Sequence, residues 1–286
     1  MPTYRVVGFL AMAILYFAIP NPRPDFTHYN CNDSECYLTL SWNLSHGRGY
    51  TRSMVDNLYL PHTTWPPGVP VLMIPATLLS GDTINWYLVK WTMCLIGLAG
   101  VLFAWLYVRS ITGNSYIADV SALLLGLSPI FWDFSHQAMA EAPLTTWVIG
   151  GLYLVDRIWA KRKPRIHEAL MAGLICGLGM MFKGHAGGLV FAPLVYLLGS
   201  RRSVGRSWRI CAMWVVFAIS FFIPQLSWMV RNLAVPATGF EGINRFRSIL
   251  AVDPNNAQSA LVTGNEFAIR VSIISAITRS TACPSR

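Results

Sequence analysis

Long apolar runs separated by short polar segments set the pattern of this sequence. The first run covers residues 4–20 and ends in Asn-Pro-Arg-Pro, which favours an uncleaved anchor over a signal peptide. A helix of about 20 apolar residues is long enough to cross the hydrocarbon core of a membrane. The pattern therefore predicts an all-α integral membrane protein, a multipass helix bundle with about seven crossings. The six later runs are Trp86–Val108, Tyr116–Trp132, Ala142–Ile158, Glu168–Phe182, Gly187–Leu198 and Ile210–Trp228.

Two of these runs and two further segments are shorter than a full crossing. Glu168–Phe182 and Gly187–Leu198 cross with the help of flanking polar residues or form a re-entrant pair, and in both cases the two ends of that hairpin share one side. Trp65–Leu79 begins with Trp-Pro-Pro-Gly, which is typical of a juxtamembrane or re-entrant helix. The apolar positions between Tyr37 and Leu44 predict a short amphipathic helix lying on the membrane.

The composition excludes several classes of protein. Charged residues make up 12% of the 286 residues and hydrophobic residues 54%, whereas a soluble domain carries about 25% charged residues. An ordinary cytosolic enzyme, a disordered tail and a collagen-like chain are therefore excluded. The 22 Lys and Arg residues exceed the 13 Asp and Glu residues, giving a net charge of +9. In a membrane protein this excess indicates orientation first and contact with membrane lipids second, and nucleic acid is not an expected partner.

The basic residues predict which side of the membrane each loop occupies. Clusters at residues 157–165 and 201–209 belong in the cytoplasm, and Arg5 and Arg109 join them there if Trp65–Leu79 does not cross. The N-terminus is then cytoplasmic, and the polar segments that carry most of the candidate chemistry lie outside. These outer segments are Asn21–Thr64, Gly81–Asn85, Asp133–Glu141, Lys183–Ala186 and the chain from Val230 onward.

Carboxylates occur in two of the predicted outer segments. Asp33 and Glu35 would share a face on a strand or extended turn. Alternatively, Asp33 caps the following helix and Glu35 is a carboxylate in its first turn. Glu141 stands at the start of an apolar run, either as a first-turn acid that favours the helix dipole or as a carboxylate facing the other outer loops.

Cations and a histidine occupy the same predicted side. Lys183 interrupts an apolar hairpin at its outer tip, where an unpartnered cation is costly, so it either snorkels toward headgroups or binds an anion such as a phosphate. Arg231 ends the last apolar run and could hold a phosphate with two hydrogen bonds. His62 precedes the Trp-Pro-Pro-Gly segment and is a candidate phosphate or metal ligand, or a polar loop residue.

Carboxylates and cations on one membrane face suit transfer from a phosphate-bearing lipid. A carboxylate would deprotonate an acceptor hydroxyl, and cations would hold the leaving phosphate. A transporter or flippase of lipid-linked sugars and an inactive membrane fragment are the alternatives. A transporter would place polar groups at mid-bilayer in repeated, broken helices, and the sequence has no internal repeat. No cofactor is required, but five side chains could supply ligands for a divalent cation, namely Asp33, Glu35, Glu141, His62 and His136.

Five motifs between Asn21 and Asn232 resemble one family of membrane enzymes. In order they are DSECYLTLSWNLSHGRGYT, HTTWPPGVPVLMIPATLLSG, LSPIFWDFSHQAMAEAP, AGLICGLGMMFKGHAGGL and IPQLSWMVRN. Together they resemble the multipass glycosyltransferases of the GT-C superfamily. The most similar branch holds the bacterial relatives of the protein O-mannosyltransferases and of the aminoarabinose transferase acting on lipid A.

This resemblance implies a function and roles for particular residues. It implies an inverting transfer of a sugar from a polyprenyl-phosphate donor to a lipid, glycan or protein acceptor, on the outer face of a bacterial plasma membrane. It implies a catalytic base in the first outer loop, which matches Asp33, with Glu35 as the alternative, and a second acid at Glu141. A basic residue is common in the family where Lys183 stands, and the Pro-Pro segment resembles the family's juxtamembrane helix at the donor entrance.

The sequence departs from this family near its end. Family members usually carry further transmembrane helices and often a soluble C-terminal domain. Residues 1–232 are therefore expected to form the catalytic transmembrane region and residues 233–286 an incomplete outer-face segment. The final residues, ITRSTACPSR, do not resemble family sequence, and we expect a C-terminal truncation.

Overall fold

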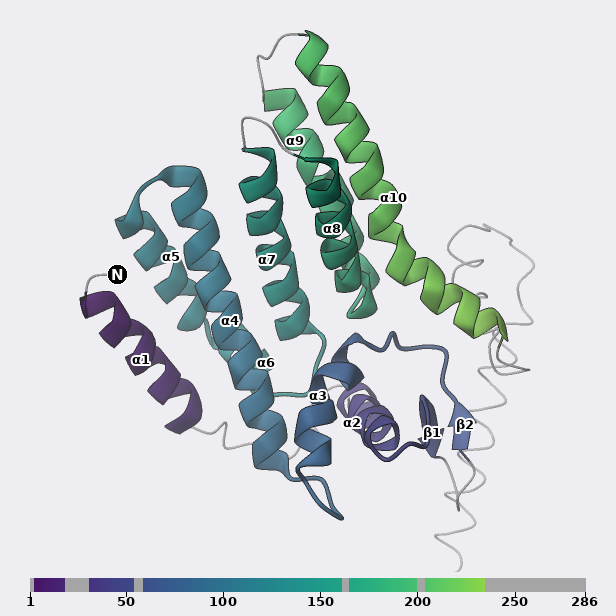
Figure 1. Cartoon of the computed structure of the whole chain (residues 1–286). Helices are drawn as coiled ribbons and strands as arrows, with labels where there is room; N and C mark the ends of the chain where they lie inside the picture. The colour runs from purple at the N-terminus through teal and green to yellow at the C-terminus, as the bar shows by residue number, and fades with distance from the viewer. Residues whose placement is uncertain (1–2, 19–30, 54–58, 161–164, 200–203, 235–286) are drawn as a thin grey trace, which may run out of the picture. The chain divides into compact units, whose positions relative to one another are not determined.

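The computed structural model describes residues 3–18, 31–53, 59–160, 165–199 and 204–234. Some segments with a predicted location lie outside the described residues. They are parts of the two basic clusters, at 161–164 and 200–203, and the C-terminal segment from residue 235 onward. The described chain is helical apart from one small hairpin (Figure 1). Its ten α-helices are α1 (Thr3–Ala18), α2 (Cys31–Ser45), α3 (Gly68–Leu78), α4 (Trp86–Thr112), α5 (Ser115–Gly126), α6 (Pro129–Phe134), α7 (Glu141–Trp159), α8 (Ile166–Gly177), α9 (Ala192–Gly199) and α10 (Val204–Ala234).

Two stretches of 3-10 helix and a two-stranded hairpin complete the described chain. The 3-10 helix η1 (Leu178–Met181) continues α8, and η2 (Gly184–Phe191) leads into α9. Strands β1 (Thr51–Ser53) and β2 (Tyr59–Pro61) pair antiparallel, with Thr51 opposite Pro61. The predicted pair of short apolar segments is thus a hairpin, α8–η1 down and η2–α9 back, with Lys183 at its turn.

The long helices run in alternating directions, so their ends form two groups (Figure 1). The loop end carries α2, α3, the β-hairpin, the start of α7 and the end of α10. The basic end carries the first turn of α1 and the connections after α4 and α7, with Arg5, Arg109, Arg157 and Arg165. These four arginines and the candidate catalytic carboxylates therefore lie at opposite ends of the bundle.

Helices α8 and α10 are packed closely because two glycines of α8 face the backbone of α10. A Cβ atom at Gly173 or Gly177 would overlap the carbonyl oxygen of Phe217 or Phe221, respectively. Small residues four positions apart let helix backbones approach in membrane proteins, where no hydrophobic effect drives helices together. This contact joins α8, which is followed by η1 and Lys183, to α10, which carries Arg231.

Helix α1 is attached to α4 and α5 at both of its ends. At the basic end, Arg5 forms an ion pair with Asp119 at 3.2 Å, and Trp105 donates from Nε1 to the same carboxylate at 2.7 Å. At the loop end, the Tyr16 hydroxyl donates to the carbonyl oxygen of Gly126 at 3.0 Å. The first apolar run therefore belongs to the bundle.

The length of the apolar helices and the exposed aromatic side chains at their ends are typical of membrane-spanning helices. Two described helices are long and apolar enough to cross, Trp86–Thr112 and Cys211–Ala234, and five shorter apolar helices accompany them. The number of seven crossings stays a prediction. Exposed aromatic side chains occur at both ends of the bundle, where membrane proteins concentrate Trp and Tyr at the two interfaces. They are Tyr4, Tyr116 and Trp208 at the basic end and Trp86, Tyr87 and Trp91 toward the loop end.

The region after α1 differs in part from the sequence prediction. The helix expected between Tyr37 and Leu44 begins at Cys31, so Asp33 and Glu35 are helical and the extended alternative is wrong. Helix α2 also packs against α3 and buries Tyr37, Leu38 and other apolar side chains. Tyr37, Leu38 and Leu40 therefore face protein, and α3 is among the elements that cover them.

Candidate functional site

Glu141 and Lys183 form an ion pair at the loop end. Lys183 Nζ lies 2.5 Å from Glu141 Oε1, with the two side chains 38% and 28% exposed. Glu141 is the first residue of α7, and Lys183 lies between η1 and η2. To the two roles predicted for Lys183, snorkelling or binding an anion, the fold adds a carboxylate partner, because it brings α7 to the turn of the hairpin. The second carboxylate oxygen, Glu141 Oε2, is buried and has no hydrogen-bond partner among the described residues.

Tyr37 is a buried tyrosine on the helix that carries Asp33. It follows Asp33 by one helical turn on α2 and is 2% exposed. Burial raises the pKa of the Tyr37 hydroxyl first, and the nearby carboxylates of Asp33 and Glu141 raise it further. Both acids are thus close enough to act electrostatically on one phenol. Glu35 is exposed, because it lies on another face of the same helix.

Arg231 binds the base of the β-hairpin. Its Nη1 donates to the carbonyl oxygen of His62 at 2.5 Å, and Nη2 donates to that of Tyr50 at 3.4 Å. The rings of Tyr50 and Trp228 lie 5.5 and 5.0 Å from the guanidinium carbon, which favours a cation. No carboxylate pairs with Arg231 in the part of the chain that the structure describes. Among the described residues, the partners of the guanidinium are therefore neutral groups.

His62 is buried at the hairpin base and takes part in local structure. Its Nε2 accepts a hydrogen bond from the backbone N–H of Trp65 at 3.0 Å, and its ring stacks on that indole at 4.9 Å between centroids. The Tyr50 hydroxyl donates to the Trp65 carbonyl oxygen at 2.8 Å. These contacts fix the chain between β2 and α3, so His62 reaches Arg231 through its backbone carbonyl.

The hairpin also connects α10 to the helix that carries Asp33. Asn43, near the end of α2, donates from Nδ2 to the Thr51 carbonyl oxygen in β1 at 2.7 Å. Gly68 at the start of α3 touches η1 so closely that a Cβ atom there would overlap the Met181 carbonyl oxygen. Asp33, Arg231 and Lys183 thus belong to elements that meet at the hairpin base and α3.

Metal ligation has little support in the described residues. They contain no group of three or more His, Cys, Asp or Glu side chains close enough together to hold a metal ion. His136, one of the five candidate ligands, directs Nδ1 at the Trp132 carbonyl oxygen, 2.7 Å away, and Nε2 at that of Tyr16, 2.9 Å away. Both of its ring nitrogens therefore face backbone oxygens.

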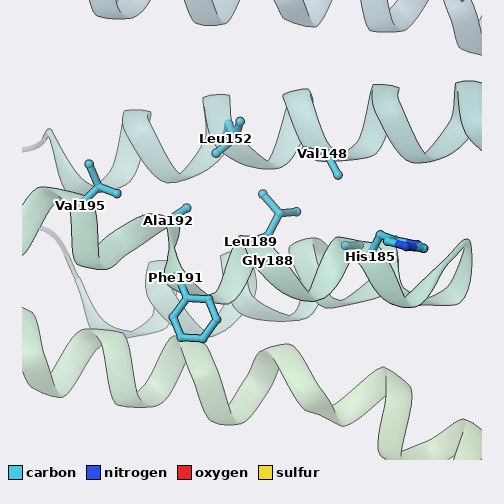
Figure 2. Close-up of a pocket in the computed structure, with 9 residues that line it drawn as sticks. Val148, Leu152, His185, Gly188, Leu189, Phe191, Ala192 and Val195 are labelled. Atoms are coloured by element: carbon cyan, nitrogen blue, oxygen red, sulfur yellow. The ribbon is translucent and has the colours of Figure 1, made fainter. Parts of the chain in front are cut away.

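An apolar groove begins beside the ion pair. It has a volume of about 340 Å³ and lies between α7 and the η2–α9 segment. Figure 2 shows His185 at one end and Val195 at the other, with Val148 and Leu152 facing Leu189 and Ala192 across the space between them. His185 is two residues beyond Lys183. The groove therefore runs away from the loop end, along the length of α7.

Two residues of this site were not identified from the sequence. The sequence could have indicated Tyr37, because a helix over residues 31–45 places it one turn after Asp33. Nothing in the local sequence indicated Asn232, because its side chain donates to the carbonyl oxygen of Thr63, a residue distant in the sequence, at 3.1 Å. The contacts of both side chains with the site form only when distant segments of the chain pack together.

Comparisons with known proteins agree on the kind of protein. Residues 64–228, more than half of the chain, match the model of the dolichyl-phosphate-mannose-protein mannosyltransferase family. The structure is similar to the crystal structure of apo ArnT from Cupriavidus metallidurans, with a TM-score of 0.59 and 20% sequence identity. This similarity covers 84% of this chain and 44% of that chain. The likeness shows a common fold over slightly less than half of ArnT. No curated protein sequence matches.

Proposed function

This chain belongs to the dolichyl-phosphate-mannose-protein mannosyltransferase family, and we propose that it transfers a sugar from a polyprenyl-phosphate donor to an acceptor hydroxyl. The family and the ArnT-like fold support a membrane glycosyltransferase of the GT-C type. The acceptor is the hydroxyl of a lipid, a glycan or a protein. One observation carries the proposal: Lys183 pairs with Glu141 at the loop end, the same end of the bundle at which α2 carries Asp33 (Figure 1).

Asp33 is the proposed base. A hydroxyl is a poor nucleophile at neutral pH and needs a carboxylate within hydrogen-bond reach to take its proton. Asp33 is half-buried in the first turn of α2, which holds it on a packed helix. Glu35 is exposed on another face of that helix. This difference in position favours Asp33 as the base over its neighbour.

Glu141 is proposed to bind a hydroxyl of one of the two substrates. Its Oε1 is occupied by Lys183, whereas Oε2 is buried and has no partner in the described chain. A buried carboxylate oxygen without a donor is costly. A sugar or acceptor hydroxyl that donates to Oε2 would remove this cost, so the ion pair would orient Glu141 for binding.

Arg231 and Lys183 are proposed to hold the donor phosphate. Arg231 keeps its positive charge uncompensated among the described residues, whereas Arg5 is paired with Asp119 and Lys183 with Glu141. An ammonium group has three N–H donors, and the ion pair occupies one on Lys183. Charge-assisted hydrogen bonds to phosphate from both residues would stabilise the leaving group. His62 supports this site by holding Arg231 through its carbonyl oxygen.

The apolar groove is proposed to take part of the donor's polyprenyl chain. Aliphatic side chains line it, and it begins close to Lys183, where the phosphate would lie. A hydrocarbon chain in the groove would leave the phosphate at the loop end. The donor would then reach the site from the bilayer.

We place the loop end outside the bacterial plasma membrane and the N-terminus in the cytoplasm. The separation of Arg5, Arg109, Arg157 and Arg165 from the carboxylates of the site supports this orientation. The exposed aromatic side chains toward both ends of the bundle support a position across the bilayer.

The proposed function is tested by comparing Asp33→Asn with Glu35→Gln. Asp33→Asn should lower turnover with a polyprenyl-phosphate sugar by at least about 100-fold, the smaller effect typical of a positioned base. Its donor affinity should largely survive. Glu35→Gln removes a carboxylate from the same helix at an exposed position, so turnover should stay within a few fold of the wild type. Near-normal turnover in Asp33→Asn would overturn this assignment, and an inactive Glu35→Gln would move the base to Glu35.

A further inference from the structure

Asn232 is buried at the end of α10 and uses both ends of its amide. Its Oδ1 accepts a hydrogen bond from Arg231 Nη1 at 2.9 Å, and its Nδ2 donates to the Thr63 carbonyl oxygen at 3.1 Å. The residue is 6% exposed. One side chain therefore joins the guanidinium to the segment that leads into α3.

Among the described residues, the hydrogen bonds of Arg231 leave two of its N–H groups without a partner. An arginine has five N–H groups. Nη1 donates to His62 and Asn232, and Nη2 donates to Tyr50, so three of the five are used. The remaining N–H groups are on Nε and Nη2. These two nitrogens form a fork that can bind two oxygens of one phosphate.

The partners of Arg231 orient its side chain without cancelling its charge. They are two backbone carbonyls, one amide oxygen and the rings of Tyr50 and Trp228. A carboxylate at residue 232 could accept the same hydrogen bond, but it would also compete with an incoming anion. The neutral amide avoids this competition.

We propose that Asn232 is a positioning residue for the donor. It fixes Arg231 so that the Nε–Nη2 edge faces the phosphate, and its neutrality keeps the arginine charge available for that phosphate. This inference rests on the proposed function of Arg231. It adds a requirement for a neutral hydrogen-bond acceptor at residue 232.

The experiment compares two substitutions of Asn232. One is expected to lower thermal stability more, and the other to lower donor affinity more. Binding of polyprenyl phosphate to the full chain in nanodiscs is measured together with the thermal unfolding midpoint. Asn232→Leu removes both hydrogen bonds, whereas Asn232→Asp loses the donor to Thr63 but keeps the size of the side chain and the acceptor toward Arg231. The midpoint should therefore fall further in Asn232→Leu. Donor affinity should fall further in Asn232→Asp, by about tenfold or more, because its carboxylate neutralises Arg231.

Asn114→Asp is the matched control for the added charge. Asn114 is the N-cap of α5 at the basic end, where its Oδ1 accepts from the backbone N–H groups of Tyr116 and Ile117. Aspartate caps a helix as well as asparagine does. This control should bind polyprenyl phosphate as the wild type does.

Two results separate this inference from the proposed function. If Arg231→Gln binds polyprenyl phosphate as tightly as the wild type, the phosphate role of Arg231 is wrong, and the role of Asn232 falls with it. If Arg231→Gln weakens binding but affinity follows thermal stability in the two Asn232 variants, or does not change in them, Asn232 is only structural. The proposed donor site would then stand without it.

Discussion

Replacing Gly177 by alanine should loosen the contact between α8 and α10. A Cβ atom at this position would overlap the Phe221 carbonyl oxygen and would lie 2.8 Å from the Phe221 carbonyl carbon. Carbon atoms in contact prefer a separation of about 3.5–4.0 Å, so the helices would have to separate by roughly 1 Å. The obstructing atoms belong to the backbone and cannot rotate away, as a flexible side chain could.

Gly8→Ala supplies the comparison that isolates this effect. Gly8 lies inside α1, and nothing stands within 4 Å of its added Cβ atom. Both substitutions gain helix propensity, about 1 kcal/mol each. The difference between the variants therefore reports the overpacking, which typically costs about 1–3 kcal/mol. At about 2–4 °C per kcal/mol, Gly177→Ala should unfold about 2–12 °C below Gly8→Ala.

The assay is thermal unfolding of the two purified variants in the same detergent, followed by polyprenyl-phosphate binding at a temperature where both are folded. Donor affinity should also fall in Gly177→Ala, because α8 leads to Lys183 and α10 carries Arg231. Gly8→Ala should bind as the wild type does. An unfolding midpoint for Gly177→Ala at or above that of Gly8→Ala would refute the reasoning from close helix packing.

Two further predictions address the ion pair and the orientation. A double-mutant cycle with Lys183→Met and Glu141→Gln should give a coupling free energy of unfolding of about 1 kcal/mol, modest because both side chains are partly exposed. Additive single effects would show that the pair contributes nothing to stability. In a background without native cysteines, a membrane-impermeant maleimide should label Asp82→Cys in intact cells and Arg157→Cys only after permeabilisation. The reverse labelling would overturn the proposed orientation.

Most of the helices could be predicted from local sequence. The apolar runs are long, and a backbone in an apolar environment must satisfy its own hydrogen bonds, so such runs become helices whatever their neighbours are. The run at Trp86–Val108 corresponds to α4, and the segment beginning Trp-Pro-Pro-Gly contains α3. The family resemblance also came from local sequence alone. It rests on five motifs in a fixed order along the chain, and these can be recognised without knowing how the helices pack.

Only the tertiary structure decided the partners of the candidate residues. The local sequence indicated that Lys183 snorkels or binds an anion, and the fold adds that α7 brings Glu141 Oε1 to 2.5 Å from its Nζ. Arg231 was expected to be a phosphate ligand, and the fold adds that the carbonyls of His62 and Tyr50 hold it. The physical reason is that a helix forms from hydrogen bonds four residues apart, whereas an ion pair or a buried amide contact depends on which distant helices become neighbours. That choice is made by close contacts such as Gly177 against Phe221, whose complementary shapes appear only when both helices are in place.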